Sequence, residues 1–153
     1  MDLKWVKKRQ KYTNKDQISA LLCYQNYLLI PFSGGQAKPE LRKVLMELGE
    51  GLKKAGKLVI VVIPPPLYHG DVKGMIDEED LDRMSDVVDY FSLMTYDYSS
   101  PQRPGPNSPI KWIRKCVETL DPNNYHREKI LLGLNFYGYD YTSEGGNPIV
   151  ISF

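Results

Sequence analysis

Polar aromatic and amide side chains stand directly after two apolar runs of this 153-residue chain. Tyr96 and Asp97 follow one run, and Asn135 and Tyr137 close another. Tyrosine rings can stack on the apolar faces of sugar rings, while hydroxyl, carboxylate and amide groups hydrogen-bond to sugar hydroxyls. The four residues therefore predict a saccharide-binding platform. Packing at the rim of a sheet, with the hydroxyls satisfied inside the protein, is an equally compatible interpretation.

Other groups of chemically active residues carry weaker signals. His69 and His126 are isolated, and neither has a second metal ligand at useful spacing. The segment Ser33-Gly34-Gly35-Gln36 is too short for a phosphate-binding loop and is not followed by the Lys-Ser/Thr pair that such loops need. We therefore expect no metal ion and no cofactor.

An acidic run lies between Asp77 and Asp86, and sparse apolar residues give it a helical pattern. Asp77 is a suitable N-cap, and the acidic residues after it suit the positive end of the helix dipole. We expect the carboxylates of this run, Asp80 and Asp82 among them, to form a solvated helix face.

The elements that position the polar residues follow from the apolar patterns. Continuous apolar runs at Leu58–Ile63, Tyr90–Tyr96 and Ile130–Tyr137 are typical of strands buried on both faces. Amphipathic helical patterns precede them at 39–56, 77–86 and 109–120. This alternation predicts an α/β fold with a parallel sheet, whose carboxyl ends gather the site at one edge. An open doubly wound sheet and part of an eight-stranded barrel both remain possible, since a whole barrel needs ~250 residues.

Composition narrows the class of protein. Hydrophobic residues make up 42% and charged residues 25%, which excludes a disordered chain. Two cysteines, Cys23 and Cys116, could pair but do not decide a compartment. Basic residues cluster near the amino terminus, but a solvated terminus explains them better than a nucleic-acid arm. The longest apolar stretch, Ile18 to Phe32, is too short and too interrupted for a membrane span, and it makes no convincing signal peptide.

The segments that carry the polar residues resemble glycoside hydrolase family 18, the chitinase barrels. Met94-Thr95-Tyr96-Asp97 is similar to the sixth-strand motif of the family, and Gly133-Leu134-Asn135-Phe136-Tyr137-Gly138 to its seventh-strand motif. The resemblance implies an incomplete TIM (β/α)8 barrel of about barrel strands four to seven, with a possible fourth strand at Tyr27 to Phe32. It adds Met94 to the predicted sugar-binding residues.

The resemblance also divides the chain and bears on catalysis. Residues 1–32 are expected to be a divergent basic segment, and residues 33–153 a partial chitinase-like domain. Strand four of the family carries the Glu general acid, but Gln25–Phe32 contains no carboxylate and Phe32 takes the place of the acid. We therefore expect no catalytic residue and no enzyme activity. An active hydrolase with an unaligned acid, a protein-interaction module and a non-functional truncated product are the alternatives.

Partners and location follow from the resemblance alone. It implies binding of chitin, chito-oligosaccharides or related glycans that contain N-acetylglucosamine. Chitinase-like members of the family also imply a stabilin-type receptor as partner, and secretion or a lysosomal location. A nucleic-acid partner is not expected.

An incomplete barrel has a physical consequence. Barrel closure removes strand edges, whereas an arc of strands leaves one sheet face and at least one edge uncovered. We therefore expect the isolated chain to be marginally stable, prone to association or dependent on a partner.

Overall fold

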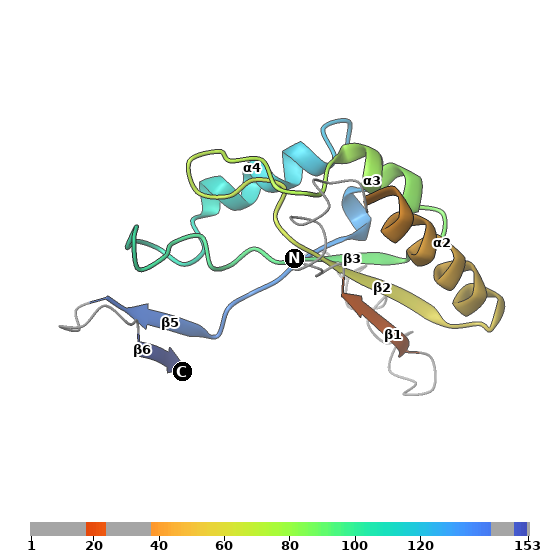
Figure 1. Cartoon of the computed structure of the whole chain (residues 1–153), viewed down its shortest axis with the longest axis horizontal. Coiled ribbons are helices and arrows are strands. Elements are labelled where there is room, and N and C mark those ends of the chain that lie inside the picture. Colours follow the sequence, from red (N-terminus) through yellow and green to blue (C-terminus); the bar gives the residue numbers. More distant parts are fainter. Residues whose placement is uncertain (1–17, 24–37, 142–148, 153) are drawn as a thin grey trace, which may run out of the picture.

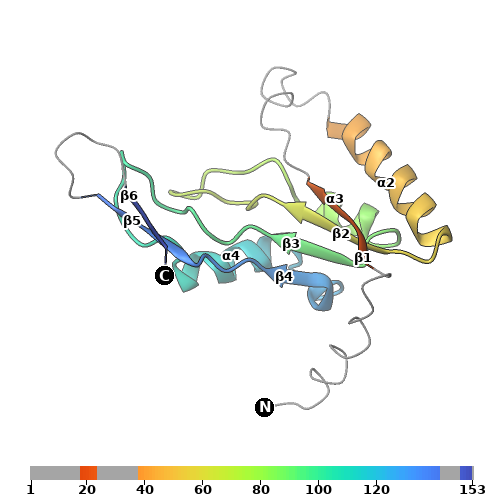
Figure 2. The same cartoon turned by 90° about the horizontal axis from the view of Figure 1, so that it is seen from below.

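A computed structural model describes residues 18–23, 38–141 and 149–152 of the chain. Four parallel strands form a sheet in the order β1-β2-β3-β4 (Figures 1 and 2). These strands are β1 (Ile18–Cys23), β2 (Leu58–Ile63), β3 (Tyr90–Leu93) and β4 (Ile130–Leu132). Sequential strands are neighbours throughout, so the predicted parallel α/β arrangement is confirmed.

Three helices connect the strands and lie on one side of the sheet (Figures 1 and 2). They are α2 (Lys38–Lys54), α3 (Glu78–Met84) and α4 (Ile110–Leu120). Asp77 caps α3 as predicted, in a reciprocal capping box with Asp80. Gly56 follows α2 with a φ of 70°, a left-handed conformation that glycine adopts without strain. A 3₁₀ turn, η1 (Arg127–Lys129), leads into β4.

The core lies between the helices and one face of the sheet. Val59, Val61 and Ile63 point to that face and are fully buried, while the alternate residues of β2 are only half-buried. The prediction that this strand is buried on both faces is therefore wrong for one face, because the described helices all pack on the other. Trp112 of α4 closes the core and donates its indole N–H to the carbonyl oxygen of Leu67 at 2.7 Å.

The strand beside β2 differs from the predicted one. We expected Tyr27 to Phe32 at this place, but β1 pairs with β2 in parallel through Ile18–Cys23. This segment is apolar and free of proline, whereas Pro31 interrupts the predicted segment. Residues 27–32 lie outside the described part of the chain.

The last predicted strand is divided in the structure. Its first half is β4, and Tyr137 belongs instead to β5 (Tyr137–Asp140), which pairs antiparallel with β6 (Ile149–Ser152). The ladder with β3 ends where the N–H of Gly133 donates to the carbonyl oxygen of Leu93 at 2.8 Å. The β5–β6 hairpin extends away from the four-stranded sheet in both views (Figures 1 and 2).

One apolar row along the β4 edge is uncovered. Leu132, Leu134 and Phe136 are 48%, 70% and 76% exposed. Leu132 pairs with the buried Leu93, so it lies on the sheet face that helices cover elsewhere. The four-stranded sheet thus has an open edge at β4, which is consistent with the predicted incomplete barrel. Within the described ranges, no helix is long and apolar enough to cross a membrane.

Candidate functional site

The carboxyl ends of β3 and β4 bring the predicted polar residues together. Tyr96 and Asp97 leave β3, and Tyr137 begins β5 after the chain leaves β4. The hydroxyl of Tyr137 donates a hydrogen bond to Oδ1 of Asp97 at 2.6 Å, across 40 residues of sequence. The ring of Tyr96 meets the ring of Tyr137 edge-on, with centroids 6.4 Å apart. The juxtaposition of these three side chains is therefore present in the structure.

The contact with Asp97 changes the chemistry of Tyr137. Burial raises the pKa of Tyr137, and the adjacent Asp97 carboxylate raises it further because phenolate would face a like charge. The pKa of Tyr139 is raised for the same two reasons. Both hydroxyls therefore keep their protons at neutral pH and can act as hydrogen-bond donors.

Backbone conformation aims the Asp97 carboxylate at Tyr137. Asp97 has a φ of 60°, in the left-handed region that non-glycine residues adopt at some energetic cost. Asn107 holds it there: its Oδ1 accepts from the N–H of Asp97 at 2.6 Å, and its carbonyl oxygen accepts from the N–H of Tyr98 at 2.9 Å. Sequence reasoning missed Asn107, although its place at the end of a Pro/Gly loop is a signal for such a turn.

The amide of Asn135 is engaged within the protein. Its Oδ1 accepts from the hydroxyl of Ser108 at 2.7 Å, and its Nδ2 donates to the carbonyl oxygen of Tyr137 at 2.7 Å. Asn135 therefore ties the start of α4 to the start of β5 and fixes the position of Tyr137. The sugar contact predicted for Asn135 would be a hydrogen bond from a sugar hydroxyl to the second lone pair of Oδ1, beside the one that accepts from Ser108.

Met94 and Thr95 connect the strands that carry the site. Met94 is only 8% exposed, and its N–H donates to the carbonyl oxygen of Ile63 at 3.0 Å. Thr95 is fully buried, and its hydroxyl donates to the carbonyl oxygen of Gly133 at 2.7 Å. These bonds join the ends of β2, β3 and β4 at the residues that immediately precede Tyr96. Contact of Met94 with a sugar stays a prediction.

The tyrosine cluster is larger than the sequence prediction. The ring of Tyr139 lies 5.6 Å from that of Tyr137 and nearly perpendicular to it, and the ring of Tyr141 lies 6.1 Å from that of Tyr139. Alternate residues of a strand share one face, so the spacing of these tyrosines was a signal that could have found them. Tyr96, Tyr137, Tyr139 and Tyr141 form one continuous row of rings, which we call the tyrosine row.

A second aromatic group lies beside the site. The ring of Tyr98 stacks on His69 with centroids 4.5 Å apart and contacts Trp112 at 5.0 Å. The buried Nδ1 of His69 and Nδ2 of Asn107 have no hydrogen-bond partner among the described residues. Cys116 nearby is a free, buried thiol, and burial raises its pKa to about 11. It is therefore not a reactive nucleophile.

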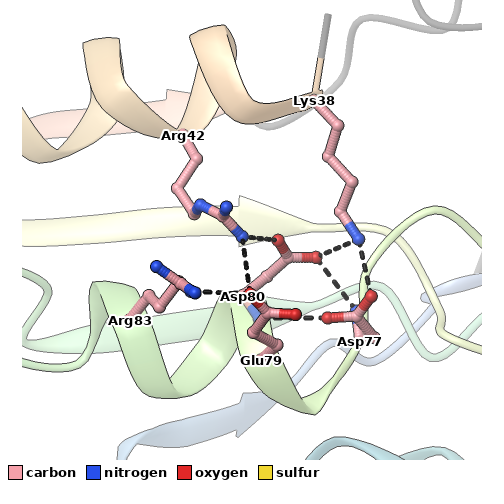
Figure 3. Close-up of polar contacts among 6 residues, drawn as sticks. All are labelled: Lys38, Arg42, Asp77, Glu79, Asp80 and Arg83. Carbon is pink, nitrogen blue, oxygen red and sulfur yellow. Dashed lines mark hydrogen bonds and ion pairs between the residues drawn. The ribbon is translucent and has the colours of Figure 1, made fainter. Parts of the chain in front are cut away.

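The acidic run from Asp77 to Asp86 is a solvated face as predicted, except at Asp80, which is the centre of a buried network. The side chain of Asp80 is fully buried, and its two carboxylate oxygens contact Nζ of Lys38 at 2.7 Å and a guanidinium nitrogen of Arg42 at 2.9 Å (Figure 3). Lys38 also contacts Asp77 at 2.6 Å. The network joins α2 to α3, and its basic partners lie nearly forty residues upstream of the run.

The other charged groups of the described residues do not assemble a metal site. In the part of the chain that the structure describes, no three His, Cys, Asp or Glu side chains lie close enough to hold a metal ion. His126 instead contacts the Asp82 carboxylate at 3.0 Å, on the exposed side of α3. Within the described part of the chain, the tyrosine row with Asp97 combines rings that can stack on a ligand with groups that can hydrogen-bond to it.

Comparison with known proteins finds one matching family and curated relatives with partial similarity. The model of glycosyl hydrolases family 18 matches residues 1–149. Probable chitinase 10 of Drosophila melanogaster is 28% identical over 125 residues, which cover 74% of this chain and 5% of that protein. The cortical fragment-lytic enzyme of Bacillus subtilis (strain 168) is 36% identical over 70 residues, which cover 41% of this chain and 15% of that enzyme.

Solved structures show the same fold. A class V chitinase from Pseudomonas fluorescens Pf-5 superposes with a TM-score of 0.60 at 28% identity, over 74% of this chain and 36% of that one. A chitinase from Chromobacterium violaceum ATCC 12472 superposes with a TM-score of 0.61 at 23% identity, over 76% of this chain and 36% of that one. The chain thus spans about a third of these solved chains and a small part of the curated relatives.

Proposed function

Because the chain belongs to glycosyl hydrolase family 18, we propose that it binds chitin or oligosaccharides of N-acetylglucosamine without hydrolysing them. The observation that carries the proposal is the contact of Tyr137 with Asp97 at the strand ends, beside the ring of Tyr96. Half-buried rings supply a stacking surface, and the exposed Asp97 carboxylate accepts hydrogen bonds from sugar hydroxyls. Each such hydrogen bond contributes ~1 kcal/mol.

The missing acid supports the non-catalytic part of the proposal. By the resemblance, the strand before β2 carries the general acid of the family. No Asp or Glu occurs anywhere between Gln17 and Pro39, a stretch that includes both β1 and the predicted segment Gln25–Phe32. Either placement of that strand therefore leaves the position of the acid without a carboxylate.

Loss of the acid reduces hydrolysis more than it reduces binding. General acid catalysis contributes ~10²–10⁴-fold to rate, since the leaving oxygen must be protonated as the glycosidic bond breaks. Sugar contacts are made by other residues, chiefly Tyr96, Asp97 and Tyr137, and do not need that proton. Binding can therefore persist in a chain that does not turn over substrate.

Two assays test the proposal together. A chito-oligosaccharide array probes binding, and a fluorogenic chitobioside probes hydrolysis, each with heat-denatured protein as the control. We expect retention on the array and no release of fluorophore above the control. Fluorophore release that disappears when a single carboxylate is mutated would identify an active hydrolase instead.

A second candidate function is recognition of a protein partner. The strand-end segments resemble chitinase domain-containing protein 1, the stabilin-interacting chitinase-like protein, and this finer resemblance also supports secretion or a lysosomal location. The uncovered row of Leu132, Leu134 and Phe136 favours a protein contact, because exposed apolar rows of this kind are typical of interfaces. Binding to an immobilised stabilin ectodomain that Phe136→Ser abolishes would support this candidate.

A further inference from the structure

The two ends of the four-stranded sheet carry uncovered apolar side chains. At the β4 end, Leu132 is 48% exposed on the sheet face that helices cover elsewhere, and Phe136, further along the chain, is 76% exposed. At the β1 end, α2 packs on β1 and β2 and leaves Val44 and Leu48 57% and 43% exposed. Five of the eight exposed large hydrophobic residues of the described part of the chain lie at these two ends.

The exposed flank of α2 points away from the other helices. Lys38 and Arg42 reach the Asp80 carboxylate of α3 at 2.7 Å and 2.9 Å, so their flank of α2 faces α3 (Figure 3). At 3.6 residues per turn, Val44 and Leu48 stand one above the other on the opposite flank. Because α2 packs on β1 and β2, whereas α3 connects β2 to β3, this apolar flank points past β1, beyond the edge of the sheet.

The two edge strands can accept each other. β1 and β4 are the outer strands of the sheet, and all neighbouring strands run parallel. Among residues 18–23, 38–141 and 149–152, each of these strands has one edge that pairs with no other strand, and such an edge is a template for pairing with a second chain. The β5–β6 hairpin extends away from the sheet and does not cover the β4 edge (Figures 1 and 2).

The sheet face opposite the helices is apolar as well. Ile60 and Val62 of β2 and Leu131 of β4 lie on this face and are only half-buried. In a closed barrel the same face is the interior, where side chains of all strands pack in layers. A partner bound to one face of the sheet would cover either these side chains or Leu132, since they lie on opposite faces. Closure of the strands into a barrel covers both.

We infer that two copies of the chain close one eight-stranded barrel, in which β1 of each copy pairs with β4 of the other. A two-fold axis along the barrel generates this arrangement, because rotation about an axis parallel to the strands keeps all of them parallel. Four strands from each copy give the eight that close a (β/α)8 barrel. At each of the two seams, the apolar flank of α2 meets the Leu132 end of the other copy. The assembly ends at two copies because both seams close together.

Sedimentation equilibrium of the full chain tests this inference. We expect a mass twice the 17.6 kDa of the single chain. Val44→Arg and Leu132→Glu each place a charge at one end of the sheet and should raise the dissociation constant of the dimer by roughly tenfold or more. Val72→Arg is the matched control, because Val72 is 59% exposed, as Val44 nearly is, but lies in the loop between β2 and α3. It should leave the mass unchanged.

An equimolar mixture of Val44→Arg and Leu132→Glu tests which ends meet. One seam of the mixed dimer joins the two substituted ends, whose charges are opposite, and the other seam joins two wild-type ends. We therefore expect the mixture to dimerise at concentrations at which neither variant dimerises alone. A dimer that joins two β4 edges would be insensitive to Val44→Arg and would show no such rescue.

Three results would overturn the inference. They are a mixture that stays monomeric, a wild-type assembly that grows beyond two copies, and a wild-type chain that is monomeric at every concentration. The last result would leave the Leu132 end of the sheet to a different protein. Circular dichroism of each variant checks that the fold is retained, and the mass of the wild-type chain decides the stoichiometry without any substitution.

Discussion

Replacing Asp80 by alanine tests whether the network between α2 and α3 stabilises the fold. The carboxylate of Asp80 is fully buried and receives Lys38 at 2.7 Å, Arg42 at 2.9 Å and the N–H of Asp77 at 3.2 Å. Removing it leaves two partly buried cations without their shared partner and breaks the capping box of α3. The mutation therefore removes interactions of two kinds at one position.

The magnitude follows from these contacts. Breaking a buried ion pair costs ~3–5 kcal/mol, and losing a helix cap costs ~1 kcal/mol. The side chains of Lys38 and Arg42 are 24% and 18% exposed and keep Asp77 and Glu79 as neighbours, which offsets part of the loss. We expect Asp80→Ala to lower the free energy of unfolding by about 3 kcal/mol.

Urea denaturation followed by circular dichroism measures this difference. Asp82→Ala is the matched control, because it makes the same substitution on the same helix at a side chain that is 70% exposed and pairs only with His126. An exposed pair contributes at most ~1 kcal/mol, so its midpoint should move little. With a denaturant slope of ~1–3 kcal/mol/M, Asp80→Ala should shift the midpoint by at least ~1 M. Equal shifts of the urea midpoint in the two variants would refute the claim that burial makes the Asp80 ion pairs more stabilising than the exposed pair of Asp82.

Three further outcomes follow from the structure. In Gly133→Ala, the new Cβ would lie 2.8 Å from the ring of Tyr96 and 2.9 Å from the carbonyl oxygen of Leu93, so displacement of that ring should weaken glycan binding severalfold by calorimetry. The free energy of unfolding should fall as pH rises from 9.0 to about 11, because the folded chain keeps the Cys116 proton that the unfolded chain loses. Thermal melts over this pH range should show a smaller fall in Tm for Cys116→Ala than for the wild-type chain. Size-exclusion chromatography should show self-association of the wild-type chain that Phe136→Ser reduces, because Phe136 is 76% exposed beside an open sheet edge; a monodisperse monomer would contradict this.

Local patterns predicted the parts of the fold that depend on local interactions. The strand Leu58–Ile63 has its predicted bounds, since an unbroken β-branched run leaves little alternative. Asp77 caps its helix because the capping box needs only residues three apart. The meeting of Tyr96 and Asp97 with Tyr137 was also predictable, because parallel strands deliver their carboxyl ends to one edge.

Features that depend on distant contacts could not be predicted in the same way. Burial of Asp80 is stabilised by Lys38 and Arg42, and no pattern within the acidic run reveals those partners. The predicted strand Ile130–Tyr137 is divided because the chain turns away from β3 after Gly133, which packs against Tyr96. Apolar periodicity continues through that point and carries no sign of the change in direction.

Titration of the full chain with a chito-oligosaccharide, by calorimetry, tests the central claim most directly. Wild-type protein, Tyr137→Ala and Tyr125→Ala should be compared, since Tyr125 is a tyrosine 76% exposed that lies outside the tyrosine row. We predict saturable binding to the wild type and to Tyr125→Ala, severalfold weaker binding to Tyr137→Ala, and an oligosaccharide recovered intact from every titration. Equal affinities in all three proteins, or no binding to any of them, would contradict a glycan site at the strand ends.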